Sequence, residues 1–326
     1  MKRSGTLKGI LAVLGMVLLI LDAKTALRGA SDGMAACIET VIPSLFPFIL
    51  LSCWLNDTVA NGDYLIPEWV TRAAGLPKRA GAILISSVLG GYPAGAQAVY
   101  QAYIAGALEK KDAERILAYT NNAGPAFIFG MVGHLFSPRA APWLLWGIHI
   151  LSAFIVRLLL GAAESRDVFY INRSKQKNEV ILKSSKVICT ICAWVITFRI
   201  IITYMANWLE SGISPALRTV IFGCLELVNG CCSLSEVTEP GMRFIICSGM
   251  LAFGGLCVMM QTVSVVHDIN IGYFFLGKLA QTVFSLILST ALVYRKWYLL
   301  ALILVPVFVF ILRNKNKCGN PVPIRV

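Results

Sequence analysis

The chain has 326 residues, of which 57% are hydrophobic and only 14% are charged. Soluble domains carry about a quarter charged residues, so this composition excludes a single globular core in water and, with it, a soluble enzyme. The formal net charge of +12 comes from Lys and Arg that lie between apolar stretches, as in the cytoplasmic loops of membrane proteins. We therefore predict a polytopic protein whose partner is the lipid bilayer and not nucleic acid.

Apolar stretches of about 20 residues, the length at which a helix crosses a bilayer, recur along the chain. The first follows Lys2 and Arg3, and no small-residue cleavage site comes after it, so we expect a retained helix rather than a signal peptide. The predicted fold class is an all-α polytopic membrane protein. Its eight crossing helices are Gly5–Leu21, Met34–Trp54, Arg115–Phe136, Pro142–Ala162, Lys186–Leu209, Ala216–Leu234, Ile271–Tyr294 and Trp297–Leu312.

A basic, polar segment at 166–186 separates two apolar halves. Basic loops stay in the cytoplasm, so this segment and both termini are expected on the cytoplasmic side. The predicted organisation is a first membrane repeat at 1–165, a basic loop at 166–186, a second membrane repeat at 187–312 and a basic tail at 313–326.

Two further apolar stretches, 80–106 and 244–266, are predicted to form one re-entrant helical hairpin in each repeat. Both contain a Gly pair followed by Gln, seven residues after the first Gly, and the first copy adds Tyr-Pro after the pair. Broken helices at membrane depth are tolerated where protein or a water-filled cavity satisfies the backbone, and transporters build substrate sites from such segments. The predicted substrate-binding residues are Gly90, Gly91, Tyr92, Pro93 and Gln97 in the first copy, and Gly254, Gly255 and Gln261 in the second.

A third break is expected inside the stretch 115–136. Gly124 and Pro125 interrupt the helical hydrogen bonds, and Asn121 and Asn122 supply polar groups beside the interruption. We predict a discontinuous helix whose four residues line the same substrate site. For any single motif the alternative is that Gly and Pro serve only helix packing.

Ionisable residues inside apolar stretches add candidates. Glu39 and Glu226 are expected to face the interior, because a carboxylate at membrane depth is costly and usually functional. An interfacial position near a helix start is the alternative for Glu39. Arg199, far from either end of its stretch, is expected to pair with a Glu or to bind an anionic solute. His134 and His149 are expected to pack or to form an interhelical hydrogen bond.

Catalytic and metal-binding signatures are missing from the sequence. It contains no GxSxG, HExxH or paired Asp motif, and no His lies near the Cys pairs Cys189/Cys192 and Cys231/Cys232. We therefore expect no catalytic residue, no metal, no cofactor and no enzymatic activity.

Four motifs together carry a resemblance: Pro43–Phe48, Gly91–Ala96, Asn121–Phe127, and Leu225-Glu226 with Gly230. In this order and chain length they resemble the YlbJ family of sporulation integral membrane proteins across nearly all of the sequence. That family belongs to a wider group with nucleoside-recognition (gate) domains and is distantly similar to concentrative nucleoside transporters. The second Gly-pair motif lacks Tyr-Pro, so the cavity is expected to be asymmetric.

The resemblance implies a role in endospore formation, with transport of dipicolinate, a small aromatic dianion, across the outer forespore membrane. The predicted function is transport of a small anionic or polar solute in the cell membrane or outer forespore membrane of an endospore-forming bacterium. Alternatives are a gate-type transporter for a nucleoside or ion, and a non-transporting scaffold for spore maturation. The coupling ion, the direction of transport, a homo-oligomeric state and the relative orientation of the repeats stay open. Eight crossings make the repeats parallel, and one crossing fewer makes them inverted.

Overall fold

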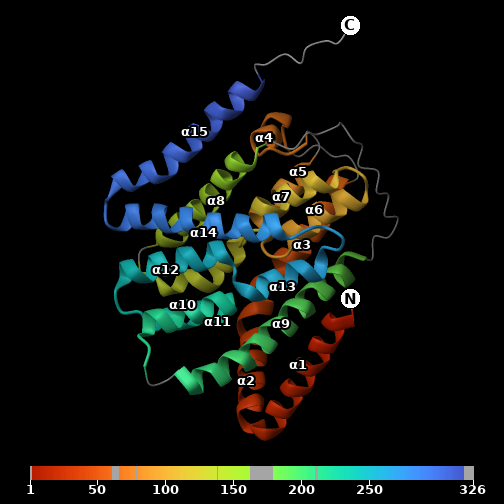
Figure 1. The fold of residues 1–326 in the computed structure, drawn as a ribbon, viewed down its shortest axis with the longest axis vertical. Helices are drawn as coiled ribbons and strands as arrows, with labels where there is room; N and C mark the ends of the chain where they lie inside the picture. Colours follow the sequence, from red (N-terminus) through yellow and green to blue (C-terminus); the bar gives the residue numbers. More distant parts are fainter. Residues whose placement is uncertain are drawn as a thin grey trace.

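The computed structural model describes residues 2–60, 66–77, 80–137, 139–161, 179–209 and 212–318, and every regular element in these ranges is helical. Figure 1 shows α1 and α2 at one end of the molecule and α15 at the other, with α14 running across the middle beside α12 and α8. The helices are α1 (Lys2–Leu21), α2 (Ala23–Ala36), η1 (Cys37–Val41), α3 (Ile42–Ala60), α4 (Glu68–Ala73), α5 (Gly81–Ile85), η2 (Ser86–Gly90), α6 (Ala94–Ile104), α7 (Lys110–Thr120), η3 (Ala126–Val132), η4 (Gly133–Leu135), α8 (Ala141–Leu160), α9 (Glu179–Leu209), α10 (Pro215–Leu225), α11 (Leu227–Ser233), η5 (Leu234–Glu236), α12 (Pro240–Phe253), α13 (Gly255–Val265), α14 (Gly272–Val293), η6 (Trp297–Leu300) and α15 (Ala301–Cys318).

Within the described residues, five helical stretches are long and apolar enough to cross a bilayer. Helices satisfy their backbone hydrogen bonds internally, which is why they are the spanning element that lipid permits. The chain is a multi-pass integral membrane protein, and its all-helical class is confirmed. The five stretches are Ala23–Leu51, Ala141–Leu160, Val180–Asn207, Pro240–Val265 and Gly272–Val293.

At the first predicted hairpin the structure forms a helix–turn–helix unit. The short helices α5 and η2 lead to a turn at Gly91–Pro93, and α6 then folds back beside them. Gly91 has a φ of +72°, a conformation that glycine adopts without steric cost. The Gly-Gly-Tyr-Pro sequence therefore forms the tip of a hairpin, with Tyr92 projecting from it.

The predicted crossing Ala216–Leu234 is instead a second hairpin, and the sequence expectation was wrong here. Helices α10 and α11 pack along one another, and Thr219 Oγ1 donates to the carbonyl of Ser233 at 3.0 Å across the pair. Glu226 is the turn between them. A Cβ on Gly230 would overlap the backbone of Gly223, so this close antiparallel packing requires both glycines.

The predicted hairpin 244–266 is instead a discontinuous helix. Helix α12 packs on α14, α8 and α10, whereas α13 packs on α9, α10 and α6, so the two do not fold back on each other. The break lies at Gly254, whose φ is +80°. The Gly90 and Gly254 motifs thus occupy different structural positions, a hairpin tip and a helix break.

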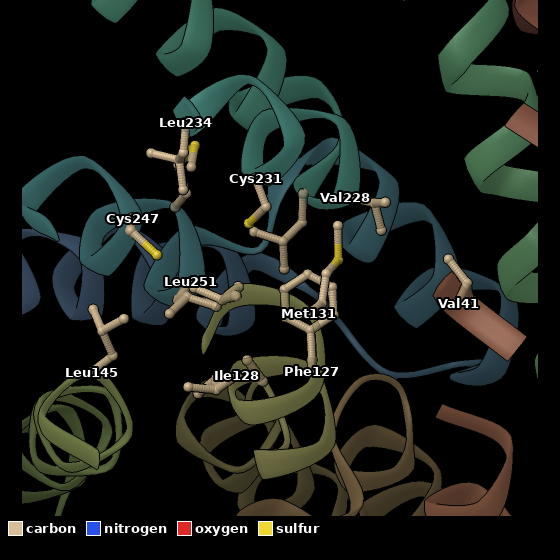
Figure 2. Packing of buried hydrophobic residues seen from close by; sticks show 14 of the residues in the cluster. Val41, Phe127, Ile128, Met131, Leu145, Val228, Cys231, Leu234, Cys247 and Leu251 are labelled. Carbon is tan, nitrogen blue, oxygen red and sulfur yellow. The ribbon is translucent and has the colours of Figure 1, made fainter. Parts of the chain in front are cut away.

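Both halves of the chain share one core. Figure 2 shows Phe127 and Met131 of η3 facing the helices of the second half, with Leu251 of α12 and Val228 of α11 on the opposite side. Helices α2 and α9 also pack closely: a Cβ on Gly33 would lie only 2.9 Å from the Cα of Ile196, so the contact depends on glycine there. The halves are therefore not separate domains.

The remaining expected helices form with shifted ends. Residues 5–21 lie in α1, 142–160 in α8, 186–209 in α9 and 271–293 in or beside α14, while 297–312 form η6 and the first part of α15. The polar loop at 166–178, the basic pair Lys78–Arg79 and the tail at 319–326 lie outside the described residues.

Candidate functional site

Two hairpin tips and two helix breaks meet inside the molecule. A Cβ on Gly124 would lie 2.9 Å from Gly91 Cα, so the break after α7 touches the first hairpin tip. A Cβ on Gly254 would lie 3.2 Å from the Tyr92 hydroxyl, and one on Gly255 would lie 3.4 Å from the backbone nitrogen of Glu226. The Gly254 break therefore lies between the tips of the two hairpins.

The Asn121–Gly124 break is extended backbone whose polar groups are satisfied by other elements. Asn121 Nδ2 donates to Thr262 Oγ1 at 2.8 Å, and its Oδ1 accepts from the backbone N–H of Ala96. The Ala123 N–H donates to His149 Nε2 at 3.0 Å. The His149 side chain of α8 thus takes the place of one missing helical bond, and α13 and α6 bond the Asn121 side chain beside it. Such replacement bonds are the condition for a break at membrane depth.

A lysine lies at the centre of this arrangement. Lys278, in the first third of α14, is 0% exposed, and its Nζ lies 2.8 Å from Gln281 Oε1 and 3.4 Å from Asn122 Oδ1. Gln281 Nε2 donates to Asn122 Oδ1 at 3.0 Å and to the carbonyl of His149 at 3.2 Å. Asn122 Nδ2 in turn donates to Ser87 Oγ of the first hairpin. We call Ser87, Asn122, His149, Lys278 and Gln281 the central network.

Tyr92 covers this network from the hairpin tip. Lys278 Nζ lies 5.2 Å from the centroid of the Tyr92 ring, a cation–π distance. The Tyr92 hydroxyl donates to the carbonyl of Leu251 at 2.8 Å, in the last turn of α12 before its break. One side chain therefore links the first hairpin, the lysine and the discontinuous helix of the second half.

A second polar network lies at the tip of the α10–α11 hairpin. Glu226 is 2% exposed, and its carboxylate accepts from the backbone N–H groups of Val228 and Asn229 and from Asn229 Nδ2, at 2.7–2.9 Å. Arg199 NH1 donates to Asn229 Oδ1 at 2.6 Å, and NH2 forms an ion pair with Asp32 Oδ2 at 3.3 Å. We call Asp32, Arg199, Glu226 and Asn229 the hairpin network.

The expected pairing of Arg199 with Glu226 is thus indirect, through Asn229. Arg199 is balanced by Asp32 on α2, whereas Glu226 is the N-cap of α11. The sequence predicted that Arg199 and Glu226 lie at membrane depth, and the structure brings both residues into one network. Their expected role in binding solute stays a prediction.

The other predicted residues divide between the interior and the surface. Gln261 is buried but donates to Cys257 Sγ, one turn earlier on α13, and Gln97 is half-buried on α6. Pro93 and Pro125 lie at the starts of α6 and η3, and Gly90 is buried at the end of η2. Glu39 lies exposed in η1, inside the continuous helical stretch Ala23–Leu51, and belongs to neither network.

Sequence reasoning missed the residues with the most polar surroundings, Lys278 and Gln281. A lysine inside the apolar stretch 271–294 is the same signal that pointed to Glu226. Asn229 and Thr262 carry no such signal, because uncharged polar residues are common in membrane helices. Among the described residues, no group of three His, Cys, Asp or Glu side chains could hold a metal ion.

Comparison with known proteins agrees with an integral membrane protein. Over 84% of its length the chain is similar to the sporulation integral membrane protein YlbJ of Bacillus subtilis strain 168, with 22% identity and 80% of the Bacillus protein covered. The chain is YlbJ-like. The resemblance drawn from the four motifs is thereby confirmed over 84% of the chain. No family model and no solved structure matches it.

Proposed function

We propose that this YlbJ-like protein is a sporulation membrane transporter for a small anionic solute, with dipicolinate as the leading candidate, in the outer forespore membrane. The observation that carries the proposal is the convergence of two hairpin tips and two helix breaks beside a fully buried polar network. Transporters use discontinuous helices in this way, since a break supplies backbone and side-chain groups to a solute near the bilayer midplane.

The contacts between the broken segments support movement rather than a static scaffold. The first hairpin touches the rest of the centre through small glycine surfaces, Ser87, the Ala96 N–H, and the hydroxyl and ring of Tyr92. Few bonds must break for the tip to withdraw, and the central network would then become accessible. A scaffold has no need of a fully buried lysine, which is expensive to place at membrane depth.

The order of elements favours two inverted halves. A hairpin, a discontinuous helix and a long helix occur as α5–α6, α7–η3 and α8, and again as α10–α11, α12–α13 and α14. Three crossings, α7–η3, α8 and α9, separate the hairpins in this proposal. An odd number of crossings inverts the second half relative to the first, as in transporters with inverted repeats.

Labelling of single cysteines tests the inversion. We expect Cys introduced at exposed Ala105, beyond the first hairpin, and at exposed Ser235, beyond the second, to react with a membrane-impermeant maleimide from opposite sides of the membrane. Labelling from the same side would overturn the inverted arrangement and restore parallel repeats. A background free of native cysteines is needed, because several of the ten are exposed.

Transport itself is tested in proteoliposomes that contain the purified protein. We expect uptake of radiolabelled dipicolinate above protein-free liposomes, measured in separate arms with a proton gradient, a Na⁺ gradient and neither. Asn121→Leu should abolish uptake, because it removes the link to Thr262, whereas Gly147→Ala has open space around its Cβ and should not. If excess uridine blocks uptake, a nucleoside becomes the preferred candidate substrate. Absence of uptake in all arms would refute dipicolinate transport.

A further inference from the structure

Lys278 lacks a carboxylate partner among the described residues. Its neighbours are the neutral oxygens of Asn122 and Gln281 and the rings of Tyr92 and Phe274, and the described ion pairs involve other residues. Fully buried charges are almost always paired, because the loss of water is otherwise uncompensated. The lysine is therefore placed where an anion would lower its free energy.

His149 supplies a second donor without an acceptor. Its Nε2 accepts from the Ala123 N–H, so in the neutral ring the proton lies on Nδ1. Nδ1 is buried and has no hydrogen-bond partner. Gln281 joins the two residues, since it accepts from Lys278 and donates to the His149 carbonyl. The central network thus has excess donors, and an acceptor-only anion, such as an ionised carboxylate, complements them.

Arg199, the sequence-based candidate for anion binding, also has a buried donor without a partner, its Nε, but its charge is already paired. Its guanidinium is balanced by Asp32 and donates to Asn229, which in turn donates to Glu226. An incoming anion there would lie near two carboxylates. Compared with Arg199, Lys278 is fully buried and its surroundings are uniformly neutral.

We propose that Lys278 is the charge-recognising residue of the transport site and binds a carboxylate of the solute. The assignment rests on the proposed transport function and names the chemistry within it. The aromatic rings of Tyr92 and Phe274, 5.2 and 6.0 Å from Nζ, flank the ammonium and suit a carboxylate borne on a flat ring. Lys278 is fully buried, so this structure is the closed form, and the solute reaches Lys278 when the Tyr92 tip withdraws.

The test is equilibrium binding to the full-length protein in nanodiscs. The probes are pyridine-2,6-dicarboxylate and its uncharged analogue pyridine-2,6-dicarboxamide, measured by isothermal titration calorimetry. The wild type should bind the dicarboxylate and discriminate against the diamide. Lys278→Met should weaken dicarboxylate binding at least about 10-fold, equivalent to about 1.4 kcal/mol. Lys296→Met, which removes an exposed lysine beyond the end of α14, should bind as the wild type does.

A second variant keeps the test valid if Lys278→Met folds poorly. Asn122→Asp is nearly isosteric and places a fixed carboxylate oxygen where Oδ1 already faces Lys278. It should abolish dicarboxylate binding because the internal carboxylate occupies the lysine. Unchanged dicarboxylate binding by Lys278→Met or by Asn122→Asp overturns the assignment while the proposed transport function stands. Failure of the wild type to bind the dicarboxylate overturns the assignment, and proteoliposome uptake then decides separately whether the chain transports it.

Discussion

Glu226 and Glu39 give a matched pair for testing which intramembrane carboxylate stabilises the fold. In Glu226→Gln, the amide oxygen can keep both bonds from Asn229, while its NH₂ group then faces the Val228 N–H. A buried donor left unsatisfied costs about 1–3 kcal/mol, so we expect this loss of unfolding free energy. Glu226→Leu leaves all three donors unsatisfied and should cost at least about 3 kcal/mol. Glu39→Gln, at an exposed position outside both networks, should stay within about 0.5 kcal/mol of the wild type.

The assay is unfolding by SDS titration in mixed micelles, followed by tryptophan fluorescence and far-ultraviolet circular dichroism. We expect the order Glu226→Leu, Glu226→Gln, Glu39→Gln from least to most stable. Equal stability of Glu226→Gln and Glu39→Gln would show that the three donors at the hairpin tip find other acceptors. Glu226 would then not be the residue that holds the α10–α11 turn.

Two further substitutions probe the contacts between the broken segments. Gly124→Ala should lower the thermal midpoint and abolish dipicolinate uptake, because its Cβ would lie 2.9 Å from Gly91 Cα. The control is Gly147→Ala, which has open space at its Cβ. Normal uptake by Gly124→Ala would contradict the tight contact. Tyr92→Phe removes the bond to the Leu251 carbonyl and should cost about 0.5–1.5 kcal/mol, with faster hydrogen exchange confined to residues 90–97. Unchanged exchange at the tip would mean that the hydroxyl does not hold the hairpin closed.

The helical class was predictable from the apolar composition. The three breaks were predictable because Gly and Pro interrupt a helix at the position where they occur. The sequence predicted a crossing helix at 216–234 and a hairpin at 244–266, whereas the structure has a hairpin at the first and a discontinuous helix at the second. The length of the first stretch explains the error. A 19-residue apolar stretch suits one crossing, and only the packing of Gly223 on Gly230 reveals that it turns back at Glu226. The Gly254–Gly255 pair lacks the Tyr-Pro that makes a tip, and sequence alone does not distinguish a sharp turn from a break.

The site was predictable where a charged or helix-breaking residue marks it, as at Asn121, Gly124 and Glu226. The assembly of those residues was not, because partners such as Ser87 and Thr262 come from elements far apart in the chain. Lys278 was not among the site residues predicted from the sequence, although the signal for it was present. It lies in a stretch that the sequence identifies as spanning, and a charge at that depth is by itself enough to make the residue a candidate.

Arg199 connects two parts of the molecule that no other described polar side chain joins in this way. Its two terminal nitrogens hold Asp32 on α2 and Asn229 on α11 at once. The Asp32 side chain is 42% exposed and readily rehydrated, whereas Asn229 is buried and also bound to Glu226. If the second hairpin moves during transport, Arg199 stays with α9, and its hydrogen bond to Asn229 must break for α11 to move away. The close packing of α2 on α9 would then be the fixed frame against which that movement occurs.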